Sequence, residues 1–452
     1  MTSTLLLLGA SFVFALLFAS RPVVLVWAPI IVRLFLPSYQ ANEWFNGPHP
    51  AGDMIMVSAL VQTIFYWPRV KKVLSSSRLE IAVFSLFCCL IMVNVLSIFN
   101  SFTDSLINIA VVYLPPFVLY LLFKMLVLRE GAGALRKVAW VMHLAMLGQM
   151  YLAIQQNITG HILVFEDTAK AALWQLQGID EITRSQGFVE TGLDFAALCA
   201  FMVALTYFIR NPIIRWVFIG LYLYGALLGN GRASILAAVI TAVVVTLAAK
   251  DRILTKLTGI GIMAGSFVWM LGTEAGQALT TKVEDDGGSS ELRKEAYRWV
   301  EGHWHLFTFT GYPGSRDFRG SGILGSSLEN AYLIVGADYG LITAAVLLAL
   351  QIFLALRNLR NAAGAVTALG ALDMIANNLT NSGFTSNQVG AYLIWIALGF
   401  ATIGKHFSEY GYAGHRPGIF ARRRKTGPVT GAAGPGRASP LRTPEAVSYG
   451  HG

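Results

Sequence analysis

Apolar runs of membrane-spanning length recur along nearly the whole chain, separated by short polar segments. A helix needs about 20 apolar residues to cross a bilayer. Runs near this length cover residues 4–20, 22–37, 54–67, 79–99, 105–127, 138–157, 192–209, 213–229, 233–249, 257–274, 331–356, 363–382 and 388–404. Only Arg21-Pro22 separates the first two, which are either two spans or one broken, re-entrant element. The pattern predicts an all-α, polytopic membrane protein with 12–13 transmembrane helices.

Composition agrees with this fold class. Of the 452 residues, 55% are hydrophobic and 13% are charged, which is too apolar for a soluble globular protein. Cys88, Cys89 and Cys199 lie inside apolar runs without the spacing of metal ligands, so we expect them to be small core residues. The first apolar run lacks an initial Lys or Arg, which favours a retained helix over a cleaved signal peptide. Pro115-Pro116 predicts a kink in the fifth run.

Basic residues gather in alternate connections between the predicted spans. They are Arg69, Lys71, Lys72 and Arg78; Arg129, Arg136 and Lys137; Arg210 and Arg215; Lys250, Arg252 and Lys256; and Arg357 and Arg360. Cytoplasmic loops of membrane proteins carry an excess of Lys and Arg. We therefore expect these connections in the cytoplasm. The long loops 158–191 and 275–330 are expected to face outward, into the periplasm of a Gram-negative cell.

The C-terminal tail differs in composition from the predicted transmembrane domain, residues 1–404. Residues 405–452 carry eight Lys or Arg against two Glu, a net charge of +6 out of the chain's +9. This Gly-, Pro- and Arg-rich segment predicts a disordered, basic cytoplasmic tail. Its basic run at 421–425 follows a membrane helix, which favours contact with anionic lipid over binding of nucleic acid.

The outward loop 275–330 contains a segment with helical spacing. Ser289 is suited to cap a helix, which we expect to continue to about Phe307. Two adjacent faces of this helix would carry Leu292, Ala296, Trp299 and Leu306 on one and Arg293, Tyr297, Val300 and Trp304 on the other. Such a pattern is typical of an amphipathic helix on a membrane surface. A glycine-rich stretch, residues 311–325, then leads to Glu329.

Glu329 and Asn330 stand where this loop meets the apolar run 331–356. A carboxylate and an amide at the mouth of a membrane helix are costly to bury and need a reason. Nine residues follow the pair before Gly340, and two more precede Thr343. This spacing resembles the signature of the bacterial O-antigen ligase and O-antigen polymerase (Wzy-type) family, where a polar pair, often His-Asn, precedes the same gap. Glu329 stands here in place of the His.

Three further segments resemble the same family. Arg293 lies eighteen residues before Gly311, as an Arg does before a Gly-rich turn in family members. The turn 230–234, Asn-Gly-Arg-Ala-Ser, resembles the family's small-residue turn with an Arg, here Arg232. The segment 184–188, Arg-Ser-Gln-Gly-Phe, resembles the Arg-x-x-Gly-aromatic segment that precedes a family helix. The resemblance thus covers residues 184–345, and the first 150 residues match only in hydropathy.

The resemblance implies a GT-C-like enzyme that transfers a glycan from an undecaprenyl diphosphate carrier, by an inverting reaction without a metal or other cofactor. Arg184, Arg232 and Arg293 would then bind the diphosphate, because the guanidinium fork matches phosphate oxygens. Glu329 would be the base that accepts the proton of the acceptor hydroxyl. Asn330 and Tyr297 would support the site. A chain-length regulator and a flippase of the same pathway are the expected partners, and nucleic acid is not.

Each of these residues also has a structural interpretation. Arg232 in a tight turn is placed to reach lipid headgroups, and Arg184 and Arg293 are placed to face water. Glu329 and Asn330 are suited to cap the following helix. His303 and His305 flank Trp304, but residues at i and i+2 do not share a helix face, so we expect no metal site there. Asp373, Asn377, Asn378 and Asn381 form a stripe that favours contact between helices over the lining of a cleft.

The sequence therefore favours a polymerase of carrier-linked repeat units of O-antigen, capsule or exopolysaccharide, in the bacterial inner membrane with a cytoplasmic C-terminus. One alternative is an O-antigen ligase that transfers the glycan to lipid A core. The other is a transporter or flippase of lipid-linked glycan, which would need charges or broken helices near the middle of the bilayer. The polar residues singled out above stand mainly in the outward loops, which favours an enzyme at the membrane surface.

Overall fold

The computed structural model describes residues 2–45, 49–98, 106–131, 133–172, 182, 184–273, 277, 289–312, 330–357, 359, 361–380, 385 and 388–410. All of them belong to one compact unit, Met1–Gly414. Over these ranges the chain forms helices and turns and no strand, which confirms the all-α class. Arg293 is described by its backbone alone.

The chain begins with two separate helices, α1 (Thr2–Leu17) and α2 (Pro22–Phe35), joined by a turn at Arg21. The sharp bend follows instead at Pro37, where α2 meets α3 (Ser38–Phe45) at 94°. Proline lacks the N–H that would continue the helical ladder, and it disfavours helical backbone at the residue before it. Leu36 is accordingly extended. The re-entrant alternative thus applies to the second and third helices rather than to the first two.

The next helices confirm the predicted apolar runs and add one element. α4 (Pro50–Phe65) is followed by α5 (Trp67–Ser76), which bends by 79° into α6 (Arg78–Ile98). Three of the first four basic residues, Arg69, Lys71 and Lys72, lie on α5, and Arg78 begins α6, so this connection is a short helix rather than a loop.

Pro115 and Pro116 do not interrupt the fifth run, and residues Leu106–Glu130 form one continuous helical segment. A π-helical turn, η1 (Ile109–Tyr113), directly precedes α8 (Leu114–Glu130), and the two prolines are among the first residues of α8. Such a turn is a common way to accommodate a change in the hydrogen-bond ladder. The two prolines that predict a kink thus directly follow a local change in helix type.

The middle of the chain forms the core. α9 (Gly133–Thr159) and the short α10 (Glu166–Ala172) precede α11 (Gly192–Leu205), which continues into a 3₁₀ turn, η3 (Thr206–Phe208). Nearly every residue of α11 is buried, because α12 (Pro212–Leu228), α13 (Arg232–Ala248) and α20 (Ala362–Asn378) pack around it. α14 (Ile253–Leu271) packs mainly on α12 and α13, with Gly259 placed against the Trp216 indole.

The C-terminal part contains α16 (Ser289–His303), a 3₁₀ turn η4 (Trp304–Phe307), α18 (Ala331–Tyr339), α19 (Leu341–Leu356) and α21 (Val389–Tyr410). Gly340 breaks the predicted run 331–356 into α18 and α19, and its φ of +95° is a backbone conformation that glycine adopts at no steric cost. α21 continues past the predicted boundary at 404 to Tyr410. The remaining tail, 411–452, lies outside the described residues.

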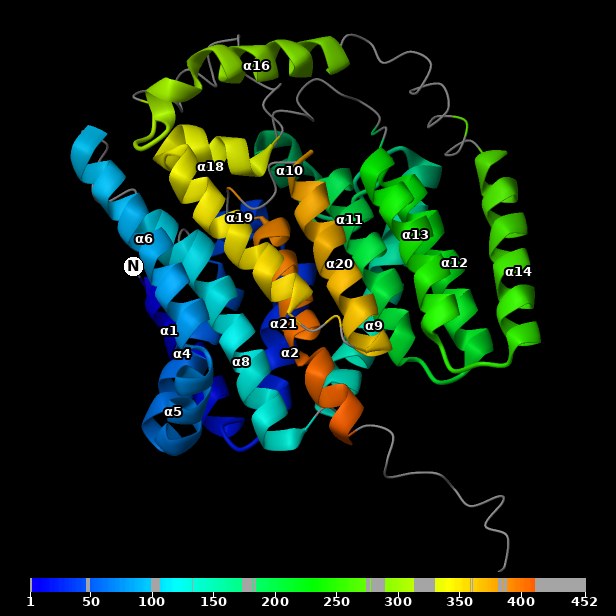
Figure 1. Ribbon diagram of the computed structural model, residues 1–452, viewed down its shortest axis with the longest axis horizontal. Helices are drawn as coiled ribbons and strands as arrows, with labels where there is room; N and C mark the ends of the chain where they lie inside the picture. The colour runs from blue at the N-terminus through cyan, green and yellow to red at the C-terminus, as the bar shows by residue number, and fades with distance from the viewer. Residues whose placement is uncertain are drawn as a thin grey trace, which may run out of the picture. The chain divides into compact units, whose positions relative to one another are not determined.

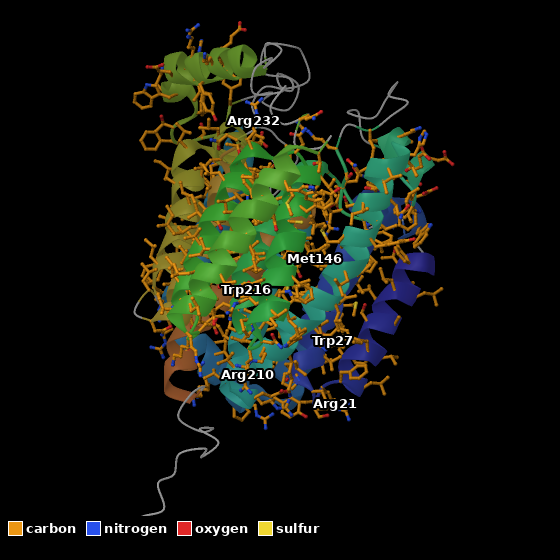
Figure 2. All side chains as sticks on the ribbon, turned by 90° about the vertical axis from the view of Figure 1, so that its right-hand side faces the viewer. Arg21, Trp27, Met146, Arg210, Trp216 and Arg232 are labelled. Carbon is orange, nitrogen blue, oxygen red and sulfur yellow. The ribbon has the colours of Figure 1, made fainter. Side chains whose placement is uncertain are left out.

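Successive long helices run back and forth between two ends of the bundle (Figure 1). One end carries α5 and the turns after α8 and α13; we call it the basic end, because the predicted basic connections lie there. Arg21 and Arg210 are seen at this end and Arg232 at the other (Figure 2). At the basic end Arg129, in the last turn of α8, donates to the carbonyls of Ala19 and Ser20 in the turn between α1 and α2. The opposite end, where α16 and α10 lie, is called the motif end.

Among the residues that the structure describes, three helices are long and apolar enough to cross a membrane, and up to five spans result if each bent pair counts as one. They are Leu106–Glu130, Gly133–Thr159 and Ile253–Met270, joined by the pairs α2 with α3 and α5 with α6. Several more described helices are apolar but shorter. Among the cysteines, Cys199 is buried as predicted, Cys88 is partly buried and Cys89 is exposed, so the prediction of a core position is wrong for Cys89.

Candidate functional site

Two of the family-like segments meet at the motif end. The Ser185 amide donates to the Leu228 carbonyl at 3.0 Å, directly before the turn that contains Arg232. Gly192 and Gly229 pack so closely that neither position has room for a Cβ atom, and the Arg184 Cβ lies against Gly192. Arg184, which is partly buried, and Arg232, which is exposed at the start of α13, therefore emerge from backbone segments in direct contact.

The segment 184–190 is buried, although the sequence predicts an outward loop over 158–191. Side chains of α9 replace the hydrogen bonds that a helix would supply. Gln156 accepts from the amides of Gln186 and Gly187 and donates to the Gly187 carbonyl. Gln149 accepts from the Phe188 amide and donates to the Leu34 carbonyl. A buried backbone that lacks a helical ladder needs such partners, so these two glutamines hold the segment in place.

Gly187 is required at the centre of this segment. Its φ is +62°, which L side chains rarely adopt, and a Cβ atom would collide with the Gln149 side-chain oxygen. The backbone conformation and the lack of space therefore explain why a glycine stands at this position of the family-like segment.

The turn before α13 is fixed by its neighbours. Asn230 has a φ of +53°, which asparagine tolerates better than most residues. Ser234 donates to Asn377 of α20 at 2.8 Å. About two helical turns further along α13, Thr241 donates to Asp373 at 2.6 Å. The polar stripe of α20 therefore joins α20 to α13, as the sequence favours. Asn381 lies outside the described residues.

α16 covers the beginning of α18. Ala296 is buried against Ile334, with Trp299 and Val300 packed beside them. The face that docks on the bundle thus combines residues from both predicted faces. Tyr297, Trp304 and Leu306 are each about half exposed. The predicted helix to about Phe307 ends at His303 and continues as a 3₁₀ turn from Trp304, so Leu306 does not continue the face that carries Ala296 and Trp299.

The segment 308–312, directly after η4, is held by hydrogen bonds against the break between α18 and α19. The Tyr312 amide donates to the Ala337 carbonyl and the Ile342 amide to that of Thr308. Asn94 of α6 accepts from the Gly311 amide and donates to the Tyr339 carbonyl. Cβ atoms at Gly311 or Gly340 would collide with backbone across this contact. Two glycines of the family-like pattern therefore serve one close approach of backbones.

Asn330 caps α18. Its side-chain oxygen accepts from the amides of Tyr332 and Leu333 at 3.0 and 3.1 Å. It is buried, and this agrees with the structural interpretation rather than with contact to substrate. Glu329, the predicted base, lies outside the described residues, and the Arg293 side chain is likewise not described. Arg293 belongs to the first half of α16, at the motif end (Figure 1).

A buried ion pair that the sequence analysis did not single out lies at the same end. Glu190 and Arg33 are each 1% exposed and meet at 2.5 Å. Glu190 also accepts from the amides of Ser38 and Val389, the first residues of α3 and α21. Arg33 lies inside the apolar run 22–37, and a charge within a membrane span needs a partner. This feature of the sequence could have predicted a buried ion pair.

His49 completes this buried group. Its Nε2 faces the Leu36 carbonyl at 2.7 Å, and its Nδ1 accepts from the Ala51 amide at the start of α4. These partners require the neutral ring with the proton on Nε2. His49 lies in the loop before α4, where burial and then the Arg33 charge hold its pKa well below its usual value.

Among the described residues, no group of three or more His, Cys, Asp or Glu side chains is arranged to hold a metal ion. His303 instead stacks on Trp299, with ring centres 4.6 Å apart, and its Nδ1 faces the Trp299 carbonyl.

No protein-family model matches the chain, and no curated protein or solved structure matches it. The assignment of a function therefore depends on the chain's own residues.

Proposed function

We propose that this chain is a polymerase of undecaprenyl-diphosphate-linked polysaccharide repeat units, with 12–13 helices crossing the bacterial inner membrane in a GT-C-like arrangement. Its site lies at the motif end, on the periplasmic side, and its C-terminus is cytoplasmic. The basic turns at the opposite end support this orientation.

One observation carries the proposal. Arg184 and Arg232 are distant in sequence, but their backbone segments touch through Ser185 and Leu228. The same end holds the start of α18, where Asn330 follows Glu329, and it is covered by α16, which carries Arg293 (Figure 1). The motif end thus gathers the family-like segments from four parts of the chain.

This grouping suits a reaction on a lipid diphosphate. The acceptor hydroxyl oxygen forms a bond to the anomeric carbon while the bond from that carbon to the diphosphate oxygen breaks. The diphosphate leaves with its electron pair, and arginines stabilise the charge that grows on it. The hydroxyl proton passes to the proposed base, Glu329.

Two other functions are compatible with parts of this arrangement. Transfer to lipid A core would make the chain a ligase, and the Glu at 329 in place of His favours the polymerase. A transporter would use charges inside the bundle, and Arg33, Glu190 and Asp373 do lie there. Each of them has protein partners that account for its burial, which favours the enzyme.

Glu329→Gln tests the proposed base. The variant keeps the shape of the side chain but cannot accept the proton, so transfer should fall by about 10²–10⁴-fold. Glu329→His should keep part of the activity if an imidazole replaces the carboxylate. The measurement is extension of a purified carrier-linked repeat unit with EDTA present. Wild-type rates from Glu329→Gln would remove this residue from the mechanism.

A further inference from the structure

The buried Glu190 lies at the end of the segment that begins with Arg184. We propose that Glu190 is a positioning residue for Arg184, which fastens the segment 184–190 so that the Arg184 guanidinium is held beside Arg232. This inference rests on the proposed function for the role of Arg184 as a diphosphate ligand. The geometric part of the inference is independent of that role.

Glu190 joins three elements through one carboxylate. Its Oε1 accepts from Arg33 of α2 at 2.5 Å and from the Ser38 amide at 2.8 Å. Its Oε2 accepts from the Val389 amide at 3.1 Å. Two of these partners are the first residues of helices, where the helix dipole favours a negative charge. Charge-assisted hydrogen bonds of this kind are about twice as strong as neutral ones.

The segment depends on such anchors because it has little structure of its own. Within 184–190 the backbone forms one turn, in which the Val189 amide donates to the Gln186 carbonyl. Gln149 and Gln156 hold its middle, and the Ser185 amide holds its start on Leu228. Glu190 holds its other end. A loss of charge at 190 therefore releases one end of a short segment whose opposite end carries Arg184.

Glu80 offers a matched control at the basic end. It is also 1% exposed and pairs with Lys124 at 3.1 Å and with Arg357. Glu80→Gln removes an equally buried, ion-paired carboxylate, but Glu80 is in the first turn of α6, directly after α5, and α5 lies at the basic end (Figure 1). Comparison of Glu190→Gln with Glu80→Gln separates positioning of Arg184 from a general loss of stability.

The first experiment measures the binding of geranylgeranyl diphosphate to the full-length protein in lipid nanodiscs. Glu190→Gln and Arg184→Ala should each weaken binding by about 10- to 100-fold, the loss expected for one charged hydrogen bond. In the Arg184→Ala background, Glu190→Gln should change the Kd by less than about twofold, because its effect is transmitted through Arg184. Glu80→Gln should leave the Kd unchanged.

Equal losses from Glu190→Gln in both backgrounds would overturn the inference, as would an unchanged Kd in Glu190→Gln beside a weakened Arg184→Ala. Binding that is unaffected by Arg184→Ala would refute the proposed role of Arg184 itself. Should Glu190→Gln not fold, Glu190→Asp replaces it, because the shorter side chain keeps the charge but cannot reach all three partners.

A second readout is independent of any ligand. A spin label on a cysteine at 184 should become more mobile in Glu190→Gln and not in Glu80→Gln, whereas a label at 232 should change in neither. Unchanged mobility at 184 would overturn the positioning role even if the proposed function holds.

Discussion

The two ends of the bundle use the same device in different settings. At the basic end Glu80, in the first turn of α6, pairs with Lys124 of α8 and with Arg357 at the end of α19, and short turns there join α5 to α6 and α8 to α9. At the motif end Glu190 ties Arg33 and the starts of two helices to a buried segment that is not helical. A turn between helices needs few anchors, whereas an irregular buried segment needs a partner for nearly every polar group.

The polar contacts at the two ends therefore have different effects. At the basic end they join one helix or turn to another. At the motif end Gln149, Gln156 and Glu190 hold one irregular conformation whose result is the placement of Arg184 beside the Arg232 turn. Rigidly held polar groups in an irregular segment are typical of a site rather than of a connection.

The largest effect expected from this comparison concerns the arginines. Arg184→Lys and Arg232→Lys should each raise the barrier to glycan transfer by about 2–4 kcal/mol, because a point charge cannot replace a two-point fork. Arg129→Lys at the basic end is the matched control and should leave transfer unchanged. The rate of extension at equal protein level measures this, and normal polymer from both motif-end variants would refute the role.

A smaller effect separates two glycines with positive φ. Gly187 has a φ of +62° and no room for a Cβ atom, whereas Gly131 at the basic end has a φ of +75° and open space around it. Gly187→Ala should lower the free energy of unfolding by about 2–4 kcal/mol and Gly131→Ala by about 1 kcal/mol. Unfolding by SDS in mixed micelles compares them. Equal losses would show that the segment around Gly187 is not tightly held.

The smallest effect concerns acid. Because the pKa of His49 is lowered in the folded protein, the unfolded chain binds a proton near pH 6.5 that the folded chain does not. Stability should therefore fall as the pH is lowered, by about 1.2 kcal/mol between pH 7 and pH 5.5 from this group. His49→Gln should remove that part of the pH dependence. His161→Gln, at a half-exposed His, should leave it in place, and the reverse pattern would contradict the account.

The helices were largely predictable from the sequence, because the length of an apolar run indicates a helix without reference to the rest of the chain. The breaks were less so. Gly340 interrupts the apolar run 331–356, where its backbone closely approaches Phe309 and Thr310 from another part of the chain. The meeting of the 184–190 segment with the Arg232 turn was expected only through the family resemblance. The burial of 184–190 was missed, because the two glutamines that permit it are ordinary residues of another helix.

The most direct test of the central claim is the reaction of the purified protein in nanodiscs with one carrier-linked repeat unit. We predict longer glycans that remain linked to the carrier diphosphate, with one undecaprenyl diphosphate released for each glycosidic bond formed. Movement of the lipid-linked glycan across a proteoliposome membrane without any new glycosidic bond would contradict the account and favour the transporter.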